Sequence, residues 1–214
     1  MVSDSSYADV DIVATLRAAA INAAVNGRDG KSRVEEDDLR IRVRKAKLPR
    51  LTVIVLDASG SMVARRITSI AKSVAAKLIE NSYVKRDYLA LIVFRGISAR
   101  VVVSLTKRYS GVMEVLESVR VGGRTPLSSA LQTLLFTAKA FKKKNRDYVV
   151  RGILITDGKA NCSLYSKPIK EELLLLASAL KKVEVRVEIY DSRDVVPSYI
   201  NLLSSALNAR VYTV

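Results

Sequence analysis

The sequence predicts an α/β fold of the Rossmann-like, doubly wound type, in which a mostly parallel central sheet has helices on both faces. From residue 51 onward, short runs rich in Val, Ile and Leu alternate with longer segments of helical periodicity, which is the pattern of strand–helix–strand units. The run 148–156 is apolar at nearly every position, as expected of a parallel strand covered on both faces. Hydrophobic residues make up 49% of the 214 residues, which is enough for a substantial core.

The expected strands and helices follow one another regularly along the chain. Strands are expected, from β-branched and apolar runs, at 51–56, 88–94, 99–104, 148–156, 184–190 and 210–214. The second and third of these should form a hairpin around Arg95 and Gly96. Helices are expected, because apolar residues recur every three or four positions, at 64–82, 109–119, 127–144, 169–182 and 196–206. Three lysines, Lys142 to Lys144, lie in the last turn of one of these helices, where the helix dipole stabilises positive charge.

The first 48 residues are expected to form a separate extension, and residues 49–214 the α/β domain. An amphipathic helix is expected at 8–26, and Asn26-Gly27 would end it. A short helix is expected at 34–39. A strand is expected at 39–44, where apolar and basic residues alternate. One interpretation of this extension is a simple helical segment that packs on the domain.

The chain is strongly basic, with 36 Lys and Arg against 21 Asp and Glu and a net charge of +15. The basic residues concentrate between residues 40 and 50 and between 139 and 151. Such a balance is consistent with a solvated basic face, with an acidic protein partner, or with RNA binding. Neither run has the interleaved aromatic residues that a stacking platform for single strands requires.

Several classes of chemistry are excluded by composition. The chain has no histidine and only one cysteine, Cys162, which excludes Ser-His-Asp triads, the usual zinc sites and an internal disulfide. The segment from Gly27 to Ser32 resembles the end of a phosphate-binding loop, but the spacing of its glycines is too short, so no ATP hydrolysis is expected. No apolar run reaches the ~18 residues of a membrane span. The N-terminus lacks the pattern of a signal peptide, so we expect a cytoplasmic protein.

Polar residues follow the first strand of the domain directly. Asp57, Ser59 and Ser61 lie on the loop between the strand 51–56 and the next helix, and in α/β sheets that edge is where ligands bind. Oxygen-only ligands of this kind suit a hard divalent cation such as Mg²⁺. The alternative is that Asp57 and Ser59 only cap the helix, and that Asp157-Gly158, after the strand 148–156, is an ordinary turn.

With two further residues the pattern becomes specific. Five oxygen-bearing residues together resemble the metal-ion-dependent adhesion site of von Willebrand factor A domains, namely Asp57, Ser59, Ser61, Thr125 and Asp157. The stretch from about residue 49 to 214 resembles such a domain throughout. An ordered set of fragments is similar to the carboxyl-terminal part of the magnesium chelatase D subunit, at 14–20, 38–40, 55–62, 94–96, 123–127 and 154–161.

The resemblance implies how the site would work. The serines would coordinate Mg²⁺ (or Mn²⁺ or Ca²⁺) directly, the aspartates would act largely through water or hydroxyl groups, and Thr125 would move in or out. With few bound carboxylates the ion stays electrophilic and accepts an Asp or Glu from a partner protein. Gly122 and Gly123 would let their loop approach the ion closely. Arg124 stands where the chelatase subunit has a glycine, and it would either repel the metal or bind the incoming carboxylate, as would Lys159.

The resemblance also implies a function. The chain would be a non-catalytic, Mg²⁺-dependent protein-interaction subunit of a magnesium or cobalt chelatase-type AAA+ machine. Its partners would be the AAA+ ATPase subunit, the large chelatase subunit, or both, and residues 1–48 would be the remnant of an AAA+ helical lid. Two alternatives remain open: an adaptor of another AAA+ ATPase that matures protein complexes, and a basic RNA-binding protein whose A domain is structural. A hydrolase that uses Asp57 or Ser59 as nucleophile is disfavoured, because no base accompanies either residue.

Overall fold

The computed structural model describes residues 10–25, 34–42, 50–60, 64–85, 87–192 and 199–213. The chain divides into two compact units, Met1–Lys47 and Leu48–Val214. Among the helices in the described ranges, none combines the length and the hydropathy that a bilayer span requires.

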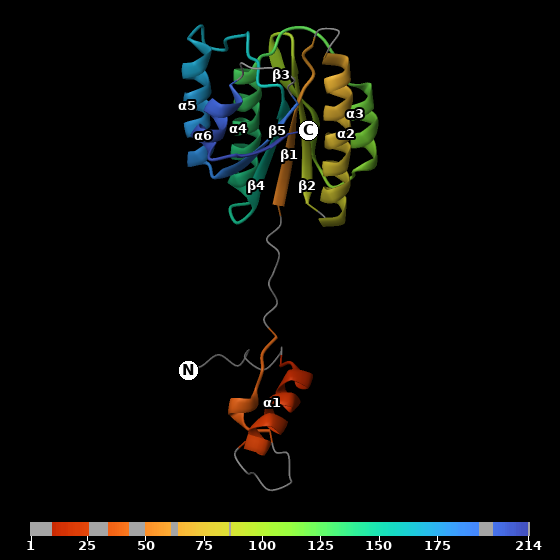
Figure 1. Ribbon diagram of the computed structural model, residues 1–214, viewed down its shortest axis with the longest axis vertical. Coiled ribbons are helices and arrows are strands. Elements are labelled where there is room, and N and C mark those ends of the chain that lie inside the picture. The colour runs from red at the N-terminus through yellow and green to blue at the C-terminus, as the bar shows by residue number, and fades with distance from the viewer. Residues whose placement is uncertain are drawn as a thin grey trace. The chain divides into compact units, whose positions relative to one another are not determined.

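A single six-stranded sheet organises the larger unit, with the strand order β3-β2-β1-β4-β5-β6 (Figure 1). The strands are β1 (Arg50–Asp57), β2 (Tyr88–Arg95), β3 (Ser98–Thr106), β4 (Val149–Thr156), β5 (Val185–Asp191) and β6 (Arg210–Thr213). The central strand β1 pairs in parallel with β2 and β4, and only β3 is antiparallel to its neighbour. The expected α/β class and the expected hairpin between β2 and β3 are both confirmed.

Helices cover both faces of this sheet (Figure 1). They are α2 (Ala64–Lys85), α3 (Ser110–Ser118), α4 (Leu127–Lys144), α5 (Ile169–Lys182) and α6 (Ile200–Leu207). On one face, α2 and α3 pack against side chains of β1, β2 and β4. On the other face, α4, α5 and α6 form a larger apolar cluster with β1, β2, β4 and β5. Leu131 and Leu134 of α4 are fully buried there, which makes α4 the central helix of that layer.

Most expected boundaries in this unit agree with the structure to within a few residues, and α4 and α5 agree at both ends. Strand β5 begins at Val185 instead of residue 184, because Glu184 adopts a left-handed turn conformation (φ 56°). Helix α2 continues to Lys85, three residues beyond the expected end. Helix α6 begins at Ile200. The earlier start expected for it, residue 196, lies outside the described residues.

The smaller unit contains α1 (Ile12–Val25) and a 3₁₀ turn, η1 (Glu36–Asp38). The strand expected at 39–44 is wrong in its described part, because only an isolated bridge joins Val10 to Ile41. Residues 43–44 lie outside the description. This segment has no neighbouring strand in the described residues, so its alternating pattern has no ladder to join. It is held instead by α1, where the backbone N–H of Arg40 donates to Thr15 Oγ1 at 3.0 Å.

Candidate metal centre

The candidate site begins at the carboxyl end of the central strand. Asp57 is the last residue of β1, and only 9% of it is exposed. Its Oδ1 accepts hydrogen bonds from the backbone N–H of Ser59 at 2.9 Å and from the Ser59 hydroxyl at 2.6 Å. These two bonds turn the chain directly after the strand and hold the Ser59 hydroxyl against the carboxylate.

A second loop places Thr125 beside these residues. The Thr125 hydroxyl donates to Ser59 Oγ at 2.9 Å, across 66 positions of sequence. Asn161 fixes the Thr125 backbone from both sides. Its Oδ1 accepts the Thr125 N–H at 2.7 Å, and its own N–H donates to the Thr125 carbonyl at 3.2 Å. Asn161 was not singled out from sequence, where nothing in its local pattern distinguishes it from other loop residues.

The glycines before Thr125 bring this loop close to the first one. The Gly122 N–H donates to the Ala58 carbonyl at 2.9 Å, between Asp57 and Ser59. Gly123 has a φ of 95°, and a Cβ there would lie 3.1 Å from the backbone of Gly96. That distance is tighter than most Cβ contacts, and L side chains rarely adopt this positive φ, so glycine is favoured where the loop passes the β2–β3 turn. The observed reason for a glycine at position 123 is therefore contact with another loop.

The third loop contributes a threonine that the sequence reasoning missed. Thr156, the last residue of β4, donates to Asp57 Oδ2 at 2.6 Å and accepts the Gly158 N–H at 3.1 Å. The sequence feature that could have identified Thr156 is a hydroxyl residue at the end of a mostly apolar strand. Asp157 itself bonds to Lys159, whose N–H lies 2.9 Å from Oδ1 and whose Nζ lies 3.2 Å from Oδ2.

The surroundings of Asp57 shift its pKa and leave it without an ion-pair partner among the described residues. Burial raises its pKa to about 6. Hydrogen bonds from Ser59 and Thr156 partly oppose that rise, and the nearby charge of Asp157 adds to it. Among the described residues, no Lys or Arg forms an ion pair with Asp57. Since buried charges are normally paired or bound to a metal, the surroundings of Asp57 are those of a carboxylate that can bind a cation.

The donor set fits a hard cation. Asp57, Ser59 and Thr125 form a continuous chain of oxygen atoms, and oxygen donors are the ligands that Mg²⁺ prefers. In the part of the chain that the structure describes, no three or more His, Cys, Asp or Glu residues are arranged so that they could hold a metal ion, so a carboxylate-rich or thiolate cage is not the arrangement found here. Ser61, the fifth expected ligand, lies outside the described residues. Three of the five expected residues are thus joined directly, and Asp157 is near enough to influence Asp57.

Arg124 and Cys162 are the sequence neighbours of Thr125 and Asn161. Arg124 is exposed and makes no ion pair with any described residue, so its side chain is not committed to either of the two expected roles. Cys162 is partly buried, and its Sγ makes only long contacts with the carbonyls of Ile97 and Ser163, at 4.0 and 3.9 Å.

Comparison with known proteins identifies the family. The sequence profile of the von Willebrand factor type A domain matches residues 52–159. The magnesium-chelatase 60 kDa subunit of Rhodobacter capsulatus is 33% identical over 163 residues, which are 73% of this chain and 28% of that protein. The 67 kDa subunit of Chlorobaculum tepidum is 36% identical over 147 residues, 65% of this chain and 23% of that protein. The chain thus spans about a quarter of the length of these relatives.

Solved structures of other proteins share the fold. A von Willebrand factor type A structure from Catenulispora acidiphila superposes with a TM-score of 0.61 at 18% sequence identity, covering 78% of this chain and 39% of that one. At this identity the likeness extends to the fold alone. The matched profile, the strand order and the convergence of three loops at one sheet edge agree, and the chain belongs to the von Willebrand factor type A domain family.

Proposed function

We propose that this chain binds Mg²⁺ at the edge of its sheet and uses the ion to hold a carboxylate of a partner protein. The residues that would hold the ion are Asp57, Ser59, Ser61, Thr125 and Asp157. The observation that most supports this proposal is the buried Asp57 carboxylate, which contacts only hydroxyl and amide groups and has no cationic partner in the described residues. The bound ion would supply a positive charge at a site that otherwise offers only oxygen donors.

The ion pair between Asp157 and Lys159 is compatible with this role. The Lys159 side chain is 66% exposed, so its bond to Asp157 is the kind of surface pair that contributes little to stability. A divalent cation competes with it readily. Lys159 then becomes available for the carboxylate of the partner.

The similarity to magnesium-chelatase subunits supports a more specific proposal. We infer that the chain is a non-catalytic subunit of a chelatase-type machine, and that its partner is an AAA+ ATPase subunit, a large chelatase subunit, or both. Sequence composition is consistent with a non-catalytic role, since the whole chain has no histidine and only one cysteine. Magnesium in this proposal is the resident ion of the site and is separate from any metal that such a machine inserts.

The N-terminal unit is part of the same proposal. We infer that residues 1–48 belong to a helical lid of the AAA+ type that precedes the A domain. Helix α1 leaves large apolar side chains exposed, among them Ile12 at 69%, Val13 at 69% and Val25 at 76%. A lid helix of an ATPase would bury such residues against the rest of that module.

A pull-down experiment tests the proposed function. The full chain is immobilised and offered the chelatase-type AAA+ ATPase subunit of the same organism, in Mg²⁺ or in EDTA. We expect retention in Mg²⁺ that is lost in EDTA and lost in Asp57→Ala. Retention that is equal in all three conditions would contradict a metal-dependent interaction. An Asp147→Ala variant is the matched control, because Asp147 is an exposed aspartate just before β4, away from the carboxyl end of the sheet.

A further inference from the structure

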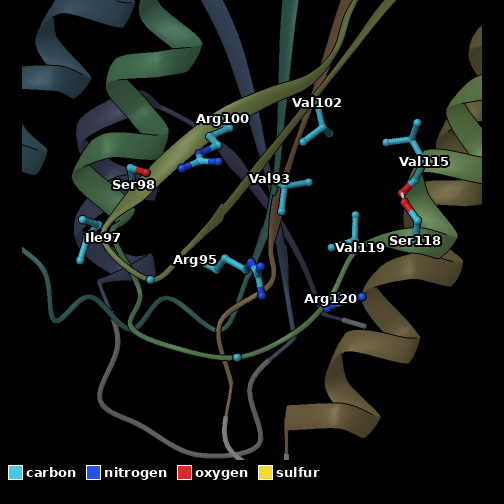
Figure 2. A pocket seen from close by; sticks show the side chains of 12 residues that line it. Val93, Arg95, Ile97, Ser98, Arg100, Val102, Val115, Ser118, Val119 and Arg120 are labelled. Carbon is cyan, nitrogen blue, oxygen red and sulfur yellow. Dashed lines mark hydrogen bonds between the residues drawn. The ribbon is translucent and has the colours of Figure 1, made fainter.

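A pocket of about 630 Å³ lies beside the candidate metal centre, and the proposed function does not use it. It is formed by the β2–β3 hairpin, the end of α3 and the segment that follows α3 (Figure 2). Four valines give it an apolar lining, namely Val93, Val102, Val115 and Val119. Its volume is in the range of ordinary ligand sites, which is about 300–1,000 Å³.

Three arginines line the same pocket. Arg95 and Arg100 come from the hairpin, and Arg120 comes from the segment after α3 (Figure 2). Among the described residues that line the pocket there is no Asp or Glu. None of these arginines makes an ion pair with any residue in the described ranges. Three like charges around one cavity repel one another, so an anionic occupant is electrostatically favoured.

The pocket adjoins the first loop of the metal centre through backbone hydrogen bonds. Gly122, which lines the pocket, donates its N–H to the carbonyl of Ala58 at 2.9 Å. Ala58 in turn donates its N–H to the carbonyl of Phe94 at 3.0 Å, next to Arg95. A chain segment that places one carboxylate at the edge of β1 therefore needs to continue only a short distance to reach the arginines.

We propose that this pocket binds an acidic segment of the partner protein, in which two or more Asp or Glu residues flank an apolar side chain. The carboxylates pair with Arg95, Arg100 and Arg120, where the guanidinium groups offer bidentate hydrogen bonds. The apolar side chain packs on the valines. This inference rests on the proposed function for the identity of the partner, since one further carboxylate of the same segment would reach the cation. The lining residues within the described ranges include no Phe, Tyr or Trp, and these residues therefore offer no stacking surface that would favour single-stranded nucleic acid.

The test uses a fluorescent peptide, Gly-Glu-Asp-Leu-Asp-Glu-Leu-Gly, and its neutral counterpart with Gln and Asn in place of Glu and Asp. Fluorescence anisotropy follows binding to the full chain in Mg²⁺ and in EDTA. The pocket variant is the double substitution Arg95→Glu/Arg100→Glu. The matched control is Lys144→Glu/Arg146→Glu, which makes the same change of net charge at two exposed positions, the last residue of α4 and the turn before β4.

We expect the acidic peptide to bind in preference to the neutral one, and the pocket variant to weaken binding at least about tenfold in both Mg²⁺ and EDTA, as the loss of two charge-assisted contacts implies. The control should change binding much less. Asp57→Ala should remove only the additional affinity seen in Mg²⁺. If Mg²⁺ adds no affinity for the acidic peptide while the pocket variant still weakens binding, the pocket is supported and the proposed metal function fails.

Three results would overturn the proposal for the pocket. The first is equal binding of the acidic and neutral peptides, and the second is an equal loss of peptide affinity in the pocket variant and the control. The third is binding of a fluorescent oligouridylate that depends on Arg95 and Arg100 while the acidic peptide does not bind, which would make the pocket a nucleic-acid site.

Discussion

Replacing Asp57 with Asn should stabilise the metal-free protein while abolishing metal binding. The substitution keeps the shape of the side chain and removes its charge. The Asn oxygen can still accept the bonds from Ser59 that reach Oδ1, and its amide group can donate to the Thr156 hydroxyl in place of the bond that Oδ2 accepts. What changes is the cost of holding a negative charge in a site that is 9% exposed and has no cationic partner among the described residues.

The magnitude follows from the pKa of Asp57. Burial raises it from 3.8 to about 6, so the folded protein binds this proton more tightly than the unfolded chain. The metal-free wild type therefore loses stability as the pH rises from about 4 to about 6, and keeps the lower value above that range. A difference of about 2 in pKa corresponds to about 3 kcal/mol. Asp57→Asn should be more stable than the wild type by up to that amount at pH 8, and similar to it at pH 4.

Urea unfolding in EDTA, followed by far-ultraviolet circular dichroism, measures this difference directly. The chain has no tryptophan, so helix content is the convenient signal. Asp147→Asn is the control, because it removes an exposed aspartate and should change stability little at either pH. A variant that is less stable than the wild type at pH 8 in EDTA would refute the reasoning, since the Asp57 carboxylate would then be stabilised by its surroundings.

Three further perturbations test the structure around the site. Thr156→Val removes the hydroxyl that donates to the buried carboxylate, and should lower the unfolding free energy by about 1–3 kcal/mol and weaken Mg²⁺ binding in calorimetry. Glu172→Gln tests the loop after β4. Burial opposes ionisation of Glu172, but hydrogen bonds from loop backbone N–H groups outweigh it and lower its pKa to about 2. The variant should therefore be less stable by about 3 kcal/mol above pH 4.5, and the difference should shrink as the pH falls toward 2 in acid-unfolding curves. Leu134→Ala, at a fully buried position of α4, should cost about 2–5 kcal/mol in urea unfolding. Leu175→Ala, at a site that is 59% exposed, should cost far less.

The elements of the larger unit could be predicted because their signals are local. Helices α4 and α5 have apolar residues at helical spacing along their whole length, and both were expected with the observed ends. Strand β4 is apolar at most positions, because it lies inside the sheet with helices on both faces. The strand expected at 39–44 shows the limit of such signals. Alternation describes one strand, but a ladder requires a neighbour that local sequence does not specify.

The site was predictable to the extent that it depends on short motifs. Asp57, Ser59 and Thr125 were expected to meet, and the structure joins them by hydrogen bonds. Thr156 and Asn161 were missed because their roles depend on which backbone and side-chain groups the fold places opposite them. The arginine-lined pocket was also missed. Arg95 and Arg100 lie on the β2–β3 hairpin and Arg120 follows α3, and they come together only when α3 packs on the sheet beside the hairpin.

Paramagnetic broadening by Mn²⁺ in nuclear magnetic resonance spectra of the backbone amides tests the central claim most directly. Mn²⁺ occupies oxygen sites that suit Mg²⁺ and broadens the signals of nearby residues. The account predicts selective loss of the amide signals of Ala58, Ser59, Thr125 and Asp157 at low Mn²⁺, with recovery on adding excess Mg²⁺ and no selective loss in Asp57→Ala. Broadening spread over exposed acidic residues, or broadening that persists in Asp57→Ala, would show that the carboxyl end of the central strand is not a cation site.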